Sequence, residues 1–297
     1  MATAFCPAHI TGFFKAELNK EDSKQLGSLG AGFSIQKGVK TTVTIRNKTK
    51  HDISNFTIKV NGFESGDMKV SKVVLSKFPT KEKFVDVIHE IDVPVGYGFG
   101  SSAAVALSLS IALNDALECK LSKIKVAQIA HDVEIECKTG LGDVLASYHG
   151  GFEIRDKPGA PGIGHVQKIA LNEISIIMIC FSPISTSKFI KERLPQINGL
   201  GGKMVNKLLE SKNYEHFQEM SLEFAKYVDV MTPRMQKVVN ELSKNNIKCG
   251  IALFGETIFS MIPKENENKV LKILKKYSDG IIIKSKLDNV GARVLHN

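Results

Sequence analysis

One segment constrains the fold more than any other: a glycine-rich loop that joins a strand-like run to a long apolar helix pattern. Gly96, Gly98 and Gly100 stand at alternate positions, and two serines follow them directly. The run at 103–117 that comes next is apolar on most of its helical circumference, which predicts a helix buried in a core. The sequence therefore predicts a strand, a glycine turn and a core helix in succession.

The composition of this loop indicates a phosphate-binding site. Phosphates bind at helix N-termini, where free N–H groups and the helix dipole attract negative charge, and glycines let the backbone approach closely. Ser101 and Ser102 stand where the helix is expected to start, so their hydroxyls can cap N–H groups or contact a phosphate or Mg²⁺. The alternative is an ordinary strand-to-helix turn, which the serine pair and the long buried helix disfavour.

Two familiar nucleotide-binding loops fit the chain poorly. The sequence has no G-x-x-x-x-G-K-[ST], and residues 199–204 have the wrong spacing for one, so we interpret them as a loop at the start of a helix. Residues 98–103 satisfy G-x-G-x-x-[GA], and Glu118 lies about 20 residues beyond. A dinucleotide-binding unit also needs an apolar strand ending at that acidic residue, and none precedes Glu118. It remains a minor alternative.

Composition limits the class of protein. The 297 residues are 43% hydrophobic, enough for one large core or two ordinary ones. The five cysteines are scattered without a C-x-x-C pair, which argues against a disulfide framework or a zinc ribbon and favours a reducing cytoplasm. The N-terminus lacks the features of a signal peptide, and the longest strongly apolar run, 174–181, is too short to span a bilayer. Neither secretion nor membrane insertion is expected.

The net charge of +9 favours anionic partners without naming one. Nucleic acid, a phosphorylated cofactor and a solvated lysine surface all fit this charge. The chain has five tyrosines and no tryptophan, and no basic block interleaved with aromatic residues. A nucleic-acid platform is therefore disfavoured, and a lysine-rich surface is the simplest explanation.

The pattern of elements predicts an α+β protein of two domains, 1–164 and 165–297. Its first part is largely β and then helical, and a glycine- and proline-rich segment at 157–164 marks the boundary. Expected strands are 40–48, 56–60, 84–93, 174–181, 251–254, 258–262 and 280–283, and expected helices are 102–117, 122–138, 204–210, 214–228, 233–244 and 268–277.

A pair of carboxylates follows the predicted phosphate loop. Glu134 lies on the second helix, and Asp143 comes after the glycine turn that ends this helix. Phosphoryl transfer needs a carboxylate for Mg²⁺ and often a second one that orients or deprotonates the acceptor hydroxyl. The alternative is structural: a solvated helix residue and a helix N-cap.

Three further groups are candidates for lining a ligand. His9 and Thr11 lie in a polar island near the N-terminus, Ser28 lies in a glycine-rich island at 27–32, and Arg155 follows a Gly-Gly-Phe run. An arginine offers bidentate geometry to a carboxylate. Each also has a plain structural interpretation: a structural histidine, a glycine turn and a surface arginine.

Together these segments resemble the GHMP kinase superfamily. Its ATP loop, P-x-x-x-G-L-G-S-S-A-A, is similar to residues 94–104, with Phe99 in place of leucine. Its N-terminal A-P-G-K-I motif corresponds to residues 6–10, where Ala8 and His9 replace the usual glycine and lysine. This departure disfavours the mevalonate and galactose branches, and a glycine-rich motif near the C-terminus is loosely matched by residues 250–257.

Within the superfamily the chain resembles the archaeal pantoate kinase family most. The resemblance rests on residues 8–14, G-S-x-G-A-G at 27–32, T-G-L-G-D at 139–143 and G-G-F-x-x-R at 150–155, and it covers nearly the whole chain. It implies an N-terminal domain like ribosomal protein S5 domain 2 and a ferredoxin-like C-terminal domain. ATP would bind between the domains, and the reaction would phosphorylate (R)-pantoate on the route to coenzyme A. It also suggests a homodimer.

The resemblance further implies the residue roles. Asp143 would orient or deprotonate the pantoate hydroxyl, and Arg155 would bind the pantoate carboxylate. Alternatives are another small hydroxylated anion as acceptor, or a non-catalytic module that binds nucleic acid or regulates. ATP would contact Pro94, Gly96, Gly98, Gly100, Ser101, Ser102 and Ala103, Mg²⁺ would be held by Ser102 and Glu134, and His9, Thr11, Ser28 and Arg155 would face the substrate.

Overall fold

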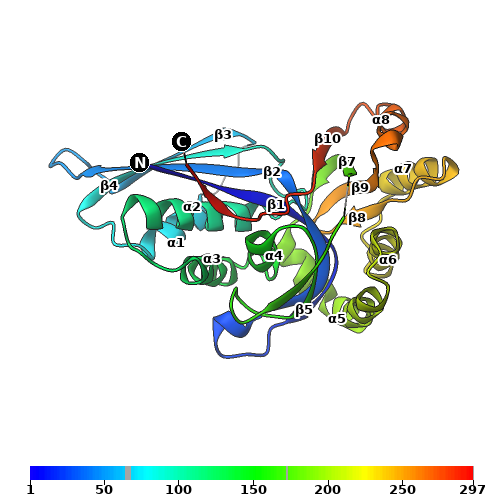
Figure 1. Ribbon diagram of the computed structural model, residues 1–297, viewed down its shortest axis with the longest axis horizontal. Helices are drawn as coiled ribbons and strands as arrows, with labels where there is room; N and C mark the ends of the chain where they lie inside the picture. The colour runs from blue at the N-terminus through cyan, green and yellow to red at the C-terminus, as the bar shows by residue number, and fades with distance from the viewer. Residues whose placement is uncertain (64–67, 172, 297) are drawn as a thin grey trace.

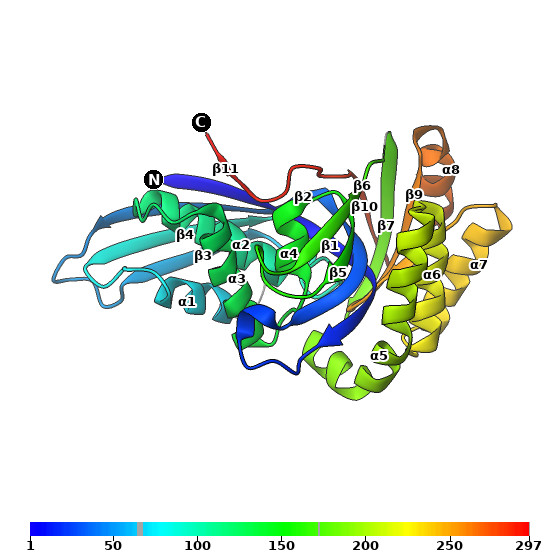
Figure 2. The ribbon, with the colours of Figure 1, turned by 60° about the horizontal axis from the view of Figure 1, so that its bottom comes forward.

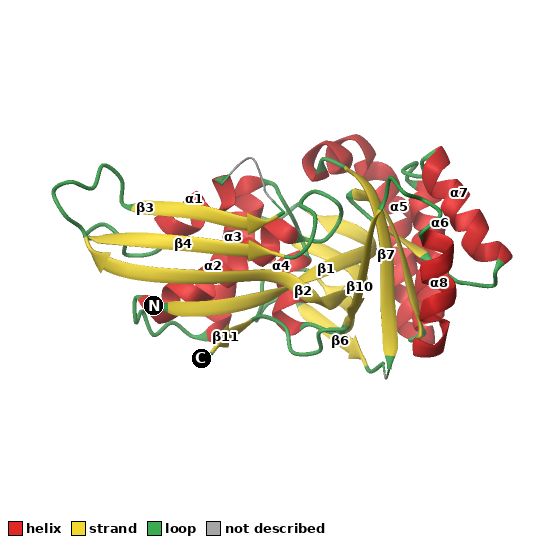
Figure 3. Cartoon of the chain, turned by 90° about the horizontal axis from the view of Figure 1, so that it is seen from above, coloured by secondary structure: helices red, strands yellow, loops and turns green. Residues whose placement is uncertain are grey.

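The computed structural model describes residues 1–63, 68–171 and 173–296. It contains two β-sheets, each with helices on one face, and the two are joined through the middle of the molecule (Figure 1). Seen from above, strands of the larger sheet lie side by side with helices behind them (Figure 3). The α+β class expected from the sequence is confirmed.

The larger sheet has seven strands and takes segments from both ends of the chain. Its main order is β11-β1-β2-β4-β3, and β5 extends it from β2, followed by β6. The termini lie near each other because β11 pairs with β1 (Figure 1). The strands are β1 (Ala2–Glu17), β2 (Gly27–Asn47), β3 (Phe56–Gly62), β4 (Lys83–Ile91), β5 (Phe152–Lys157), β6 (His165–Ile169) and β11 (Arg293–Leu295).

Strand β2 changes partner halfway along its length, and this change builds the middle of the molecule. Residues 39–47 of β2 pair with β4, whereas residues 30–33 pair with β5. The register between β1 and β2 shifts at Pro7 and Ala8, where Gln36 and Lys37 of β2 are left without a partner in β1. Such a bulge bends a strand and strengthens its twist. It therefore aims the first half of β2 away from β4.

Four helices lie on one face of the larger sheet: α1 (Lys69–Ser76), α2 (Ser101–Ala116), α3 (Lys123–Cys137) and α4 (Asp143–His149). Helices α2 and α4 contact β1 and β2, and α3 packs on the other three helices. The expected helices at 102–117 and 122–138 are confirmed by α2 and α3. Ser122 caps α3 by accepting a hydrogen bond from the Lys125 N–H. Most of α2 is buried, as the apolar run predicts.

The second sheet has four strands and carries the remaining helices. Its order, β10-β7-β9-β8, and the chain order strand, helices, two strands, helix, strand are those of a ferredoxin-like unit. The strands are β7 (Ile174–Pro183), β8 (Gly250–Ala252), β9 (Gly255–Pro263) and β10 (Ile281–Lys286), and the helices are α5 (Thr186–Ser211), α6 (Tyr214–Tyr227), α7 (Pro233–Lys244) and α8 (Glu267–Leu274).

Aromatic side chains join the two sheets. Phe33 of β2 and Phe152 of β5 face Phe217 of α6, with ring centroids 6.2 and 5.0 Å away, and Phe217 stacks on Phe259 of β9 at 5.7 Å. All four rings are fully buried. Aromatic pairs at such distances are each worth about 0.5–1.5 kcal/mol beyond their burial. The strands β1, β2 and β5 are therefore held firmly against the second sheet.

The division of the chain at residue 164 stays a prediction. The chain leaves the larger sheet between Ile169, which ends β6, and Ile174, which begins β7. Strand β6 pairs with β5, and β11 returns to pair with β1, so the larger sheet includes strands from beyond the expected boundary.

Two sequence interpretations are corrected by the structure, and one disfavoured alternative is excluded. Residues 199–203 lie inside α5 and do not form a loop at its start. Gly201 is needed there because a Cβ would overlap the Phe14 carbonyl of β1. The polar islands around His9 and Ser28 are the strands β1 and β2, where a turn was the simpler expectation for the glycines. The residues between α2 and α3 form no strand, so the dinucleotide-binding alternative fails.

No helix in the described ranges combines the length and the apolar character needed to cross a bilayer.

Candidate active site

The glycine loop forms a tight turn ahead of α2, as expected. Gly96, Gly98 and Gly100 have φ angles of 84°, 86° and 55°, a region that glycine enters at least cost. The turn at 253–255 packs against the loop: the Thr257 hydroxyl donates to the Tyr97 carbonyl over 2.8 Å, and a Cβ at Gly98 would overlap the Leu253 carbonyl. The weakly matched segment at 250–257 therefore supports the loop from the second sheet.

Two cavities lie along this loop, and a third adjoins the first of them. The outer cleft is lined by residues 95–102 of the loop, the N-terminus of α5, Thr139 and Asp143. The apolar pocket lies beyond Ser101 and Ser102 and is lined by Val60, Val70, Ile91, Val105 and their neighbours. The inner pocket lies on the other side, against β1, β2 and β5. Thr11, Asp143, Thr186 and Phe254 line both the outer cleft and the inner pocket.

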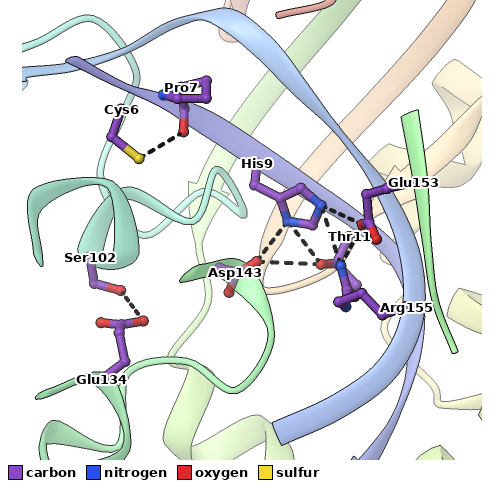
Figure 4. Close-up of polar contacts among 9 residues, drawn as sticks. All are labelled: Cys6, Pro7, His9, Thr11, Ser102, Glu134, Asp143, Glu153 and Arg155. Carbon is purple, nitrogen blue, oxygen red and sulfur yellow. Dashed lines mark hydrogen bonds and ion pairs between the residues drawn. The ribbon is translucent and has the colours of Figure 1, made fainter. Parts of the chain in front are cut away.

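Ser102 and Glu134 meet at the edge of the outer cleft (Figure 4). The Ser102 hydroxyl donates to Glu134 Oε2 over 3.2 Å, and the Thr139 hydroxyl donates to Glu134 Oε1 over 2.5 Å. Glu134 is only 2% exposed, and burial raises its pKa to about 7 despite these two hydrogen bonds. A hydroxyl and a carboxylate are the hard oxygen donors that Mg²⁺ prefers. The pair therefore fits a Mg²⁺ that also contacts phosphates and waters.

Adjacent strands form a polar floor beneath the inner pocket. Thr11 of β1, Gly32 of β2 and Glu153 of β5 lie in one row across the sheet, and Gly30 pairs with Arg155 in the row beside it. Since side chains alternate between the faces of a strand, His9, Ser28 and these residues share one face. The aromatic rings of Phe33 and Phe152 occupy the opposite face. Figure 2 shows β5 and α4 between the helices of the larger sheet and the second sheet.

Glycine in β2 makes room for two large side chains to lie across the strand. A Cβ at Gly32 would come within 2.5 Å of His9 Nε2, and one at Gly30 within 2.6 Å of Arg155 Nη2. Real Cβ atoms essentially never approach so closely. The glycine-rich island at 27–32 therefore contributes to this site by leaving space for His9 and Arg155, and it does not cradle a phosphate.

A chain of hydrogen bonds runs across this floor (Figure 4). His9 Nδ1 lies 2.8 Å from Asp143 Oδ1, and His9 Nε2 lies 2.9 Å from Glu153 Oε1. Arg155 Nη1 donates to the same Glu153 oxygen over 2.5 Å. The side chains of His9, Glu153 and Arg155 are at most 1% exposed, whereas Asp143 keeps 15% of its side-chain surface open. Of these four side chains, Arg155 lines the inner pocket, whereas Asp143 lines both the inner pocket and the outer cleft.

The surroundings set opposite charges on Asp143 and His9. Burial alone would raise the pKa of Asp143, but the hydrogen bond from His9, the charges of His9 and Arg155, and the Thr11 hydroxyl outweigh it and hold the pKa below its ordinary value. Burial alone would lower the pKa of His9, yet its hydrogen bonds to Asp143 and Glu153 raise it above the usual range. These shifts favour an ionised Asp143 beside a protonated His9.

The inner pocket combines one cation, several hydroxyls and apolar walls. A Cβ at Gly142 would lie 2.8 Å from Arg155 Nε and against the Ser28 hydroxyl, so both groups lie directly under this glycine. Arg155 Nε is buried and has no hydrogen-bond partner in the described structure. Apolar walls come from Phe14, Leu141, Ile190 and Phe254.

The structure brings the residues singled out from sequence into two adjoining groups. The glycine loop, Ser101 and Ser102 line the outer cleft, and Glu134 contacts Ser102 at its edge. The second group forms or lines the inner pocket and its floor: His9, Thr11, Ser28, Asp143 and Arg155. Pro94 and Ala103 do not line the outer cleft, and Ala103 is fully buried in α2. Their contact with a nucleotide stays a prediction.

Sequence reasoning missed Glu153, Thr139 and the N-terminus of α5. Glu153 stands two positions before Arg155 on β5, so the alternation of a strand would have placed the two on one face. Thr139 follows Lys138, whose left-handed conformation ends α3 and turns the chain toward Glu134. No local signal brings Thr186 to the inner pocket, because that contact crosses between the two sheets.

Comparison with known proteins identifies the family. Residues 68–151 match the family model described as the GHMP kinases N terminal domain. The chain is 34% identical to pantoate kinase of Methanocaldococcus jannaschii over 91% of its own length and 96% of that protein. It is 29% identical to pantoate kinase of Thermococcus kodakarensis, with 91% of each chain covered.

The fold agrees with this assignment. A solved structure named as a phosphotransferase related to the CoA biosynthesis pathway superposes with a TM-score of 0.88 at 28% identity, covering 98% of this chain and 97% of that one. The GHMP kinase fold implied by the motifs is thereby confirmed. The chain belongs to the pantoate kinase family of the GHMP kinases, which are ATP-dependent kinases.

Proposed function

We propose that this protein transfers the γ-phosphate of ATP to the 4-hydroxyl of (R)-pantoate, giving ADP and 4-phosphopantoate. The observation that carries the proposal is the shared wall between the outer cleft and the inner pocket, where Asp143 lines both. A phosphate in the first cavity and a hydroxyl in the second meet at this carboxylate. Phosphoryl transfer depends mainly on such positioning and on neutralising charge.

The nucleotide has a suitable place along the loop. Its phosphates would lie against the N–H groups of residues 96–102 and near Lys138, which also lines the outer cleft. Its base would enter the apolar pocket beyond Ser101 and Ser102. Ser102 and Glu134 would hold Mg²⁺, which neutralises phosphate charge when bound. These hard oxygen donors support the proposal of Mg²⁺ as the metal.

The residues that line the inner pocket offer a contact for each part of pantoate. A carboxylate would accept hydrogen bonds from the unpartnered Arg155 Nε and from the nearby Ser28 hydroxyl. The two methyl groups on C3 would contact Phe14, Ile190 and Phe254. Asp143 would then accept the hydrogen bond of the reacting hydroxyl and orient it, or take its proton as the phosphate transfers.

An acceptor panel tests the proposal. Purified protein with Mg-ATP is assayed for ADP release with pantoate, mevalonate, phosphomevalonate, shikimate and homoserine. We expect turnover confined to pantoate. Turnover with another acceptor would keep the kinase and change the substrate, and ATP binding without turnover on any acceptor would favour the binding-module alternative. Salt-sensitive nucleic-acid binding would point the same way, since counterion release makes such binding weaken steeply with salt.

Glu134 makes a pH-dependent prediction about Mg²⁺. Because its pKa is raised to about 7, Glu134 is protonated in the ligand-free protein below that pH, and Mg²⁺ must displace the proton. The apparent Mg²⁺ affinity of the complex with a non-hydrolysable ATP analogue should therefore fall on acidification below about pH 7, approaching tenfold per unit, and level off above it. Calorimetric titration at several pH values measures this dependence.

Glu134→Gln supplies the control. Glutamine cannot ionise, so Mg²⁺ should bind more weakly, and the part of the pH dependence that belongs to the protein should disappear. The titration of the nucleotide phosphates remains in both proteins and cancels in the comparison. Equal pH dependence in the two proteins would show that Glu134 does not bind the metal.

Compartment and assembly stay proposals. The five cysteines, all within the described residues, form no disulfide there, which supports a reducing cytoplasm as the location. The proposal of a homodimer rests on the family resemblance alone, and sedimentation of the purified protein would test it.

A further inference from the structure

Glu153 is a buried carboxylate for which the proposed reaction provides no role. It is fully buried, and its Oε1 receives both His9 Nε2 at 2.9 Å and Arg155 Nη1 at 2.5 Å. Its Oε2 has no hydrogen-bond partner in the described structure. An ionised carboxylate at such a depth is stable only when cations hold it. Two cationic side chains converge on it here.

The geometry of His9 defines its charge. Each ring nitrogen lies within 3 Å of a carboxylate oxygen, Nδ1 at 2.8 Å from Asp143 and Nε2 at 2.9 Å from Glu153. A neutral imidazole donates from one nitrogen only, so its other lone pair would face a carboxylate oxygen. An imidazolium donates from both. The arrangement of two carboxylates on opposite sides of one ring therefore selects the protonated form.

The other groups around His9 do not change this conclusion. The Thr11 hydroxyl lies 3.4 Å from Nδ1 and also donates a hydrogen bond to Asp143 Oδ1. Arg155 Nη1 lies 3.4 Å from Nε2 and disfavours a second positive charge, but Glu153 Oε1 contacts both nitrogens and its negative charge offsets this repulsion. Without Glu153, His9 would face one carboxylate on one side and a guanidinium on the other. The imidazolium thus depends on Glu153.

We propose that Glu153 is a positioning residue that holds His9 as an imidazolium and fixes the guanidinium of Arg155. Through His9 it keeps Asp143 ionised at the shared wall of the two cavities. Through Arg155 Nη1 it holds the guanidinium by one end, with Nε beneath Gly142 at the inner pocket. Glu153 thereby controls two groups: the charge of Asp143, which acts on the acceptor hydroxyl, and the orientation of Arg155, which binds the acceptor. The kinetic part of this inference rests on the proposed function.

Glu153→Gln tests the proposal because it preserves shape and removes charge. His9 should then lose its proton as the pH rises past the ordinary imidazole value of about 6.5. We expect kcat of the variant to fall about tenfold at about pH 8.5, because Asp143 loses its charged partner, and to recover largely at about pH 6. The parent protein should show no such limb over this range.

Asp156→Asn is the matched control. Asp156 lies on the same strand, and its carboxylate bonds His165 and Gln167 over 2.6 and 2.7 Å, away from the site. The Asp156→Asn variant should retain the kcat and the pH profile of the parent. If Glu153→Gln lowers kcat by the same factor at every pH, its role is structural and the proposal fails.

A measurement on the parent protein keeps the test independent of activity. Nitrogen-15 NMR of the imidazole rings, with His9 assigned by its absence in His9→Gln, reports the protonation state directly. We expect His9 to remain an imidazolium at about pH 8 in the parent and to become neutral in Glu153→Gln. A neutral His9 in the parent would overturn the proposal, whether or not the variant folds. Absence of pantoate-dependent turnover would contradict the proposed function and leave this result intact.

Discussion

Replacing Asp143 with alanine is expected to lower kcat by a factor on the order of 10² or more while leaving ATP binding nearly unchanged. Asp143 lines both the outer cleft and the inner pocket, and its Oδ1 accepts a hydrogen bond from His9 over 2.8 Å. The alanine variant lacks the carboxylate that would accept the hydrogen bond of the reacting hydroxyl, at the point where phosphate and alcohol meet. The phosphate contacts come from the loop and should persist.

Steady-state kinetics measure the change in kcat, and nucleotide titration measures ATP binding separately. Asp115 is an exposed carboxylate on α2, and Asp115→Ala should behave as the parent, which controls for loss of a negative charge. Asp143→Asn separates orientation from proton transfer, because an amide can still accept a hydrogen bond but cannot take the proton. Turnover of Asp143→Ala within a few-fold of the parent would remove Asp143 from the reaction.

The sequence could predict those parts of the site whose residues lie close together along the chain. The glycine loop, Ser102 and the start of α2 lie within a few residues of one another, and the left-handed φ angles of its glycines are a local property. Glu134 and Asp143 flank one helix end, so their proximity also follows from a short turn. The chemistry of an anion at a helix N-terminus needs no distant contact.

The polar floor beneath the inner pocket could not be predicted, because the residues that form it lie far apart in the sequence. Pro7, Gly12 and the glycines at 27–32 weaken any strand signal, since glycine and proline are poor strand formers. Pairing between β1, β2 and β5 overrides that preference: Thr11, Gly32 and Glu153 meet from three distant segments. Glycine here serves packing, because the neighbouring side chains need its missing Cβ.

The long helix α5 was only partly predicted for a similar reason. Pro195 and three glycines lie within it, and each of these residues lowers helix propensity. Burial of Phe189, Ile197 and Met204 against the core compensates for that loss. Its N-terminal half, which lines both cavities, was therefore left unassigned by the sequence pattern.

Removal of Arg155 should affect stability and acceptor binding together. Arg155→Ala leaves Glu153 buried with only His9 as a cationic partner, and breaking a buried ion pair from one side costs about 3–5 kcal/mol. We expect a clear fall in the denaturant midpoint of unfolding. The KM for pantoate should rise by a factor on the order of 10², because Arg155 Nε is the buried donor without a partner beneath the inner pocket.

Arg155→Lys separates the two effects. Lysine keeps a positive charge that can reach Glu153, so most of the unfolding free energy should be retained. It lacks the planar fork whose Nη1 contacts Glu153 while Nε stays beneath Gly142 at the inner pocket. The KM for pantoate should therefore remain at least about tenfold above that of the parent, with the KM for ATP unchanged. A lysine variant with the parent's KM for pantoate would show that Arg155 contributes charge alone, and the carboxylate would then have to be held by other donors of the inner pocket.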